Sequence, residues 1–370
     1  MFNLHAIQAE FGDSLLLEFG TAAEPKFILV DGGPPTTFER HLRAVLQQRV
    51  CAATGRLEQV ILSHIDADHI VGLIDLLADL RAQRANGEPE LVRIAGLWHN
   101  SFGRTIDPNN RVVPRLRSLL STAGAQSVMS GTAIAVNGIS EGHGLRIAAQ
   151  DLGIPINTGF SDVITLDTAR TPVQFGNLRL TVVGPTRANL AALQREWEEW
   201  LDKHEDEIAT GDPLLMANSD RSVPNLSSIS LLAEADGRRL LLTGDARSDH
   251  LLEGLEAANL LDNEGNIQLD VLKIPHHGSN RNITKTFFRK VRANRYVISA
   301  NGKYGNPDLA TLIWLVEAAK EQNRQVEIIV TNETGSTAKL REEYPPNEFG
   351  YQMRARAEDQ SSVEVPLSRA

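Results

Sequence analysis

The chain has 370 residues, of which 42% are hydrophobic and 23% charged, a balance typical of a globular protein rather than a disordered one. Its formal charge is −10, with 37 Lys and Arg against 47 Asp and Glu. Proteins that bind long nucleic acid non-specifically usually present a basic surface, so this charge offers that class no general support, although a local basic patch is compatible with it. The single cysteine, Cys51, excludes an internal disulfide and a cysteine-rich zinc site.

The amino terminus bears on where the protein resides. Residues 1–5 lack the basic start and long apolar run of a signal peptide. No window approaches the roughly 18 apolar residues that a membrane span requires. We therefore expect a cytoplasmic protein with no membrane partner.

Short apolar runs that stop at breaking residues predict buried strands in the first part of the chain, at 15–19, 27–30 and 59–62. The second run ends in Asp31-Gly32-Gly33, and the third leads directly into His64-Ile65-Asp66-Ala67-Asp68-His69. Apolar residues at helical spacing follow at once, so we expect a helix over about 70–80. A strand, an acidic loop and a helix in this order mark the place where α/β proteins carry chemistry.

The middle of the chain, about 99–220, is rich in Asn, Gly, Ser and Thr and predicts an irregular and helical insertion. Its clearest element is a helix over 190–204, which we interpret as a solvated helix lying on the core, with capping of a substrate as the alternative. Regular structure is expected to return with a hairpin at 229–232 and 240–242. A helix near 251–255, strands at 271–274, 296–299 and 327–330 and a helix at 309–319 follow. We expect one domain over 1–345 and a polar tail over 346–370 that is frayed beyond about Arg354.

Four groups of polar residues follow predicted strands and predict a shared metal site. In the first group, His64 and Asp66 are suited to share one cation, and Asp68 and His69 a second. The alternative is a solvated acidic turn that caps the next helix. The other groups are Asp31, Asp245 and the pair His276-His277, for which a glycine turn, a helix cap and a plain turn are the alternatives.

Among these groups Asp245 is suited to bridge two cations, because a carboxylate offers two oxygens. Either His276 or His277 completes the coordination shell of the second metal. Four such groups at four strand ends favour one site over four unrelated turns.

These residues, in their order along the chain, resemble the motifs of the metallo-β-lactamase superfamily. The matching motifs are Asp31, His64-x-Asp66-x-Asp68-His69, Thr243-Gly244-Asp245 and Lys273-x-x-His276-His277-Gly278-Ser279. The form with Asp66 in place of a second histidine is similar to the hydrolase domain of the competence protein ComEC and its free-standing relatives. Further matches to that subgroup are Gly12-Asp13, Asn225-x-x-Ser228 and Asn301 to Pro307. The resemblance implies an αββα sandwich and metal-dependent phosphodiester cleavage, in many relatives on DNA.

Two departures from the family pattern affect the expected chemistry. The superfamily's middle histidine has no obvious counterpart, and His99 and His143 are the candidates. The first metal therefore sees mainly hard oxygen donors, which favours Mn²⁺ or Mg²⁺ more than an all-histidine site would, with Zn²⁺ also compatible. Relatives often carry His-Pro where this chain has Asn306-Pro307. If that histidine protonates the leaving group, His277 or a metal-bound water takes its place here.

We therefore expect a phosphodiesterase or nuclease with two divalent ions, Mn²⁺ or Zn²⁺ with Mg²⁺ as a further option, in which a water bridging the metals attacks phosphorus. The expected metal ligands are His64, Asp66, Asp68, His69, Asp245 and His276. Asp31 or Asp68 is expected to orient the water and His277 to act in catalysis. Ser279 and Asn280 are expected to contact the phosphate, and Lys303 to balance its charge, with an ordinary surface lysine as the alternative for Lys303. The alternatives are a hydrolase of a small phosphoester, lactone or thioester, and a weakly active effector that works with protein partners or as a homo-oligomer.

Overall fold

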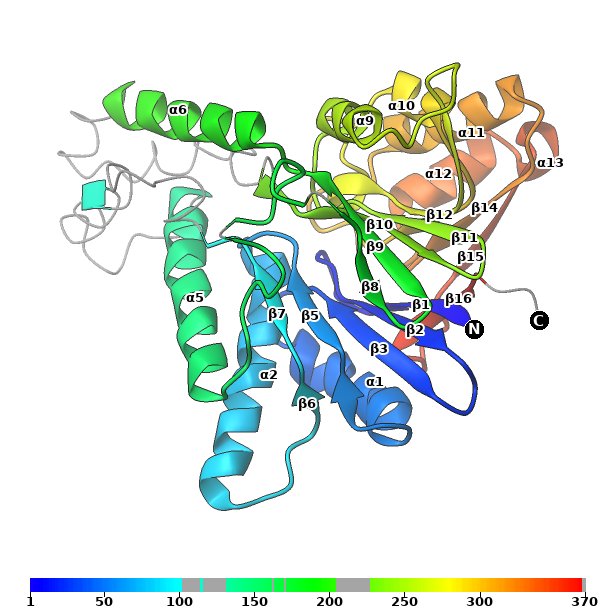
Figure 1. The fold of residues 1–370 in the computed structure, drawn as a ribbon. Coiled ribbons are helices and arrows are strands. Elements are labelled where there is room, and N and C mark those ends of the chain that lie inside the picture. The colour runs from blue at the N-terminus through cyan, green and yellow to red at the C-terminus, as the bar shows by residue number, and fades with distance from the viewer. Residues whose placement is uncertain (102–113, 116–130, 162, 170, 204–226, 368–370) are drawn as a thin grey trace.

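The computed structural model describes residues 1–101, 114–115, 131–161, 163–169, 171–203 and 227–367, and its centre is a pair of β-sheets packed face to face (Figure 1). The first sheet has six strands in the order β16 (Ser362–Pro366), β1 (Phe2–Ile7), β2 (Leu15–Gly20), β3 (Pro25–Val30), β5 (Gln59–Leu62) and β7 (Leu97–His99). The second has eight, in the order β15 (Tyr351–Ala355), β14 (Val326–Val330), β13 (Val291–Ile298), β12 (Ile267–Lys273), β11 (Arg238–Leu242), β10 (Ser230–Ala235), β9 (Leu178–Gly184) and β8 (Val173–Phe175). A short parallel pair joins β4 (Arg56–Leu57) and β6 (Arg93–Ile94).

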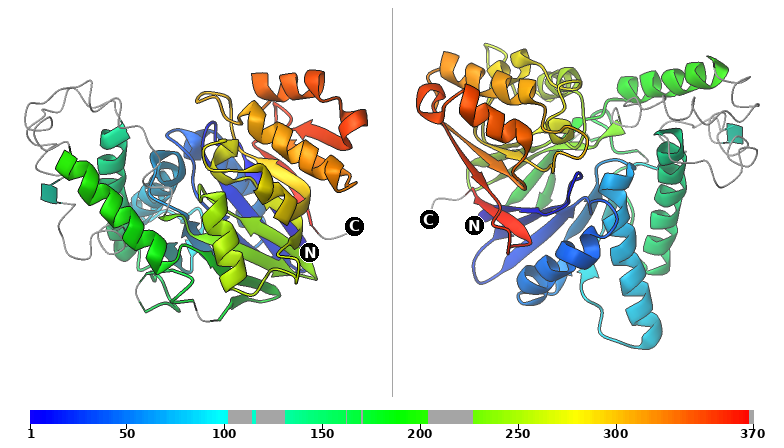
Figure 2. Two further views of the ribbon diagram at one scale, coloured as in Figure 1. Left: turned by 90° about the horizontal axis from the view of Figure 1, so that it is seen from above. Right: turned by 180° about the vertical axis from the view of Figure 1, so that it is seen from behind.

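Helices cover the outer faces of both sheets (Figure 2). Those on the side of the first sheet are η1 (Phe38–Leu42), α1 (Arg43–Val45), η2 (Leu46–Cys51), α2 (Ala67–Asn86) and α5 (Gly131–Asp151). Those over the second are α9 (Ser248–Ala257), α10 (Lys285–Lys290), α11 (Leu309–Glu321), α12 (Gly335–Glu343) and α13 (Pro346–Phe349). The helix α6 (Arg187–Lys203) and the short turn η4 (Pro275–Gly278) complete the set that the structure describes. No helix in these ranges is both long enough and apolar enough to span a membrane.

Three hydrophobic clusters fill the spaces between these four layers. One lies between the two sheets, and the others lie between each sheet and its own helices. Strand β2 contributes to two of these clusters. Leu15 and Leu17 face the cluster between the sheets, while Leu16 faces the outer helices. A strand that is buried on both faces needs apolar residues at successive positions, not at alternate ones. The αββα sandwich that the sequence predicts is confirmed.

The strands and helices flanking the motifs lie where the sequence predicts them. Strand β5 matches its predicted range, and β10 and β11 form the expected antiparallel hairpin. The predicted insertion at about 99–220 differs in one respect, since β8 and β9 within it extend the second sheet. The parts of that prediction at 102–113, 116–130 and 204–226 lie outside the described residues, as does Asn225.

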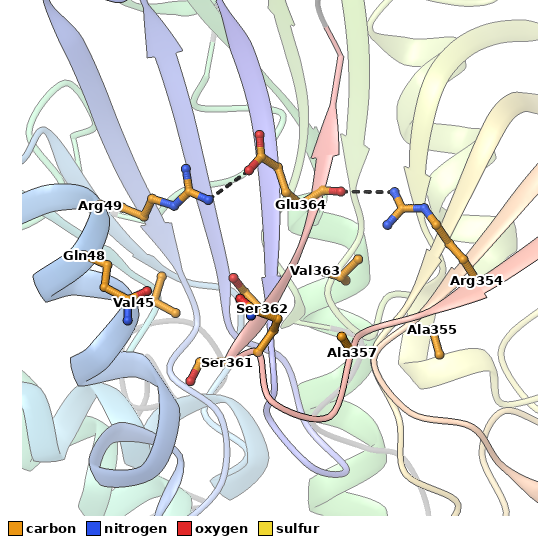
Figure 3. A pocket seen from close by; sticks show the side chains of 11 residues that line it. Val45, Gln48, Arg49, Arg354, Ala355, Ala357, Ser361, Ser362, Val363 and Glu364 are labelled. Carbon is orange, nitrogen blue, oxygen red and sulfur yellow. Dashed lines mark hydrogen bonds and ion pairs between the residues drawn. The ribbon is translucent and has the colours of Figure 1, made fainter.

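The predicted tail at 346–370 is corrected by the structure, because β15 and β16 in this segment each complete a sheet. Val363 and Val365 are buried between polar neighbours, a two-residue period that the polar composition of the segment conceals. Glu364 of β16 links both halves of the molecule (Figure 3): its carboxylate lies 2.9 Å from Arg49 Nη2, and its carbonyl accepts a hydrogen bond from Arg354. A cavity of about 390 Å³ opens beside these side chains.

Helix α2 approaches the loop after β3 so closely that only glycine fits between them. Gly32 N donates to His69 O at 2.7 Å, and Gly72 N donates to Gly33 O at 3.0 Å. A β-carbon on Gly72 would lie 1.9 Å from the carbonyl oxygen of Gly32. This contact fixes the first turn of α2, and with it His69, against the end of β3.

We expect Gly72→Ala to lower the free energy of unfolding by about 1–3 kcal/mol, because the added methyl group forces α2 away from the loop. Gly144 in α5 is the matched control, since no described atom lies within 4 Å of a β-carbon there. Gly144→Ala should stabilise by up to about 1 kcal/mol through helix propensity alone. Urea unfolding of both variants measures this, and equal midpoints for Gly72→Ala and the unsubstituted protein would contradict the close approach.

Candidate metal centre

The carboxyl ends of strands from both sheets bring the predicted residues together at one edge of the sandwich. His64 and His69 follow β5, Asp245 follows β11, and His277 follows β12. Their ligand atoms, with those of Asp68, form two of the four donor groups in the described residues in which all ligand atoms lie within 4.8 Å of one another. These groups are His64, His69 and Asp245, and Asp68, His69 and His277.

Three buried histidines of this site, His64, His69 and His277, each have a polar neighbour at Nδ1. His69 Nδ1 lies 2.8 Å from Asp31 Oδ2, and His277 Nδ1 lies 3.0 Å from the carbonyl oxygen of Ser299. Both oxygens only accept, so both Nδ1 atoms carry the proton. His64 Nδ1 lies 3.0 Å from Ser63 Oγ, whose own proton is donated to Asp31. The Nε2 atoms are therefore left with lone pairs that point into the site, as metal-ligating histidines present them.

The atoms that face the centre of the site are buried without a hydrogen bond. Among the described side chains, these orphaned atoms include Nε2 of His64, His69 and His277 and one carboxylate oxygen each of Asp66 and Asp245. Buried polar atoms in folded proteins almost always find a partner. Five such atoms at this site indicate missing partners, and divalent cations accept lone pairs from imidazole nitrogens and carboxylate oxygens alike.

Asp245 lies at the centre of the cluster and is almost fully buried. Its Oδ1 is 3.3 Å from His69 Nε2, and its Oδ2 is 3.4 Å from His277 Nε2 and 3.8 Å from His64 Nε2. The two oxygens therefore face different histidines. This is the arrangement that a bridging carboxylate requires.

The charges of the site favour positively charged occupants. Burial would raise the pKa of Asp245, but the surrounding histidines outweigh it and hold the pKa well below its usual value. Burial would likewise lower the pKa of His69 and His277, yet the carboxylates around them, Asp245 first, raise both well above the ordinary value. Protons or metal ions are thus drawn to the same lone pairs.

Asp31 is placed differently from the expectation that it orients an attacking water. Its Oδ1 accepts from the Ser63 amide at 2.7 Å, and its Oδ2 accepts from Ser63 Oγ and His69. Both oxygens are therefore engaged behind the histidines. Asp31 thus contacts Ser63 and His69 through hydrogen bonds, and its backbone has a positive φ of 59°.

Asp66 and Asp68 both project towards the site. Asp66 is the residue before α2, but its side chain makes no capping hydrogen bond, so the helix-cap alternative does not account for it. Asp66 Oδ2 lies 3.5 Å from His64 Nε2. Asp68 Oδ2 lies 3.3 Å from His277 Nε2 and 4.0 Å from His69 Nε2.

The structure separates the two histidines of the His276-His277 pair. His277 is buried and belongs to a donor group, whereas His276 is 22% exposed, with its Nε2 3.7 Å from Asp245 Oδ2. Both take positive φ angles, which turn successive side chains to the same region. His277, and not His276, thus belongs to a donor group among the described residues, and His276 stands at the rim.

Neither candidate for the missing middle histidine belongs to a donor group in the described part of the chain. His99, at the end of β7, is buried, and burial together with Arg146 lowers its pKa to about 4. His143 is exposed on α5. His64 is thus the histidine that stands beside Asp66, and Asp245 lies near it.

A buried ion pair behind His277 was not assigned from the sequence. Lys273 is fully buried, and its Nζ lies 2.7 Å from Asp13 Oδ2, while Asp13 Oδ1 lies 3.4 Å from His277 Nδ1. Burial raises the pKa of Asp13, but Lys273 and His277 outweigh it and lower the pKa far below its usual value. The sequence feature that could have revealed this ion pair is Lys273, a lysine inside an apolar strand that leads into His276 and His277.

The three predicted phosphate-contacting residues lie around η4 and the loop beyond β13. Ser279 is buried, and its amide donates to His276 O. The backbone amide of Asn280 donates to Asp308 Oδ2 at 2.8 Å, so this backbone amide is not directed at a phosphate. Lys303 is exposed, with its Nζ 3.9 Å from the centre of the Phe11 ring.

Comparison with known proteins finds partial similarities. No protein-family model matches the chain. Microtubule-associated protein 1A of Rattus norvegicus is 34% identical over 125 residues, which are 32% of this chain and 4% of that protein. ComE operon protein 3 of Bacillus subtilis (strain 168) is 29% identical over 119 residues, 32% of this chain and 14% of that protein. The chain thus spans a small part of the curated relatives that it matches.

Two solved structures show remote likeness. One is a diphosphatase of the PhnP family, with a TM-score of 0.39, 11% identity and coverage of 99% of this chain and 98% of that one. The other is a hydrolase of the beta-lactamase superfamily, with a TM-score of 0.35, 13% identity and coverage of 74% of each chain. At these values neither structure bears on the activity of this chain.

We expect Lys273→Met to lower the free energy of unfolding by about 3–5 kcal/mol at neutral pH, because it leaves the buried Asp13 carboxylate without its counter-charge. Unfolding is measured in chelator so that bound metal does not contribute. The deficit should narrow as the pH falls, because the pKa of Asp13 is depressed in the unsubstituted protein and its stabilisation is lost towards acid.

Lys285→Met is the control, since Lys285 is paired near the surface with Glu317 and should cost at most about 1 kcal/mol. Adding Asp13→Asn to Lys273→Met should recover part of the loss. A double variant no more stable than the single one would show that Asp13 carries no unmatched charge.

Proposed function

We propose that the protein is a hydrolase that depends on two divalent cations and cleaves phosphodiesters, in nucleic acid or in a smaller molecule. The observation that carries the proposal is the convergence of five orphaned donor atoms, three of them on histidines whose opposite nitrogens are already held. Bound divalent cations in such sites lower the pKa of a water molecule and stabilise the charge that develops on a phosphoryl group.

The donors divide between two positions. In the proposal, His64 and Asp66 hold the first cation, and Asp68, His69 and His277 hold the second. Asp245 would contribute to both, because its Oδ1 lies 3.3 Å from His69 Nε2, while its Oδ2 lies 3.8 Å from His64 Nε2 and 3.4 Å from His277 Nε2. Sites of this type place the two ions about 3.5–4 Å apart.

The remaining residues hold these ligands or act at the rim. Asp31 and Ser63 orient His69 and His64, and the carbonyl of Ser299 orients His277. His276 stands at the open side, partly exposed, and we assign it the proton that the leaving group needs, since Asn306 has no acidic proton to give. The sequence predicted the opposite roles, with His276 as a metal ligand and His277 in catalysis.

Asp245→Ala should remove more activity than His64→Ala, because loss of a shared carboxylate leaves two cations with no common negative partner. We expect fewer than two metal ions per chain and a loss of at least about 100-fold in phosphodiester turnover, comparable with removal of a major electrostatic contribution. Asp249→Ala is the control, since Asp249 is exposed and pairs with Arg247. Metal content by mass spectrometry and turnover of a phosphodiester panel provide the readouts, and a milder loss for Asp245→Ala than for His64→Ala would show that it does not bridge.

The oxygen-rich first position should make Mn²⁺ a better activator than Zn²⁺ after chelation. One imidazole beside two carboxylates is a hard donor set that accepts six-coordinate ions. Because Zn²⁺ usually binds more tightly, the comparison uses the rate at saturating metal. Asp66→His should shift the preference towards Zn²⁺, and an unsubstituted protein that is fastest with Zn²⁺ and unchanged by this substitution would contradict the assignment of donors.

A further inference from the structure

We infer that Phe11, Lys303 and Tyr304 form a platform on which an unpaired nucleobase stacks beside the scissile phosphate. Tyr304 is 66% exposed and Ile147 41%, and they are the exposed large hydrophobic side chains of the described residues. The rings of Phe11 and Tyr304 meet edge to face, with centroids 5.2 Å apart and planes at 86°. Lys303 Nζ lies 3.9 Å from the Phe11 ring centre and 5.1 Å from that of Tyr304.

Two loops carry this platform, and both contact the segments that carry the proposed metal ligands. Gly12, next to Phe11, is so close to Asp68 that a β-carbon there would lie 1.9 Å from its carbonyl oxygen. The Asp308 amide donates to Gly278 O at 3.0 Å, which ties the second loop to the turn that carries His277. The loops are also joined to each other, because Asn301 Nδ2 donates to Glu10 Oε2 at 2.9 Å. The platform is therefore attached to the site at two points.

The chemistry of the platform fits a nucleotide better than a small uncharged ester. An exposed aromatic ring offers a face for stacking, and stacking of a base on an aromatic side chain tolerates any base. The ammonium of Lys303 rests on an aromatic ring, a geometry that holds it in place while leaving its protons available to a phosphate. The Glu10 carboxylate is already engaged by Asn301.

The inference rests on the proposed phosphodiesterase function and narrows its substrate. In a duplex each base is already stacked and paired, so its face is not available to Tyr304. A substrate for this platform therefore contains an unpaired nucleotide next to the bond that is cut, as in single-stranded nucleic acid.

The test compares two oligomers with the same backbone charge. One is a short single-stranded oligodeoxynucleotide, and the other has the same length with tetrahydrofuran abasic units in place of nucleosides. Cleavage with Mn²⁺ gives kcat/KM, and fluorescence anisotropy with metal-free protein gives binding independently of catalysis. The variants are Tyr304→Ala, Tyr304→Phe and Lys303→Met, with Ile147→Ala as the control for loss of exposed apolar surface.

Tyr304→Ala should lower kcat/KM and affinity for the base-containing oligomer by roughly 5- to 150-fold and leave the abasic oligomer unchanged. Tyr304→Phe should retain the activity of the unsubstituted protein. Lys303→Met should lower kcat/KM and affinity for both oligomers by the same factor. An equal effect of Tyr304→Ala on both oligomers, or none on either, overturns the platform. Failure of the unsubstituted protein to cleave any phosphodiester would instead refute the proposed function, while the binding comparison still decides the platform.

Discussion

A lysine with no exposed surface is stable only if its charge is matched, and Lys273 is matched by Asp13 at 2.7 Å. The two residues come from different sheets, since Asp13 precedes β2 and Lys273 ends β12. Their pairing therefore fixes how the two sheets are positioned relative to each other at the edge where the proposed metal ligands lie. Because Asp13 also faces His277 Nδ1, the same contact sets the position of a proposed ligand.

This registration matters because the donors are divided between the two sheets. His64, Asp66, Asp68 and His69 follow a strand of the first, and Asp245 and His277 follow strands of the second. Neither group alone surrounds two cations. The hydrophobic cluster between the sheets, with Leu17 on one side and Leu242 on the other, supplies the burial that holds the two groups together.

The strand ends and their polar residues could be predicted because apolar runs that stop at Asp or His leave a clear pattern. Ring orientation could not, since it depends on Asp31 and Ser299, which lie far from their histidines in the sequence. The partnership of Asp13 with Lys273 spans 260 positions, and neither residue alone indicates the other. The same limit applied to β16, whose partner β1 lies at the opposite end of the chain.

The negative charge of the site also bears on its substrate. Three carboxylates, Asp66, Asp68 and Asp245, face the centre, so bound cations would strengthen the attraction of the site for a phosphodiester. Metal binding and substrate access are thereby coupled, and the overall charge of −10 does not exclude an anionic substrate.

The pairing of β16 with β1 has a consequence for how the chain is made. Residues 2–7 are synthesised long before residues 362–366, which form their neighbour on one side. Until residues 362–366 have been synthesised, that edge of the first sheet presents unpaired backbone groups, which are prone to pairing with other chains. Removal of β16 would leave this edge permanently open.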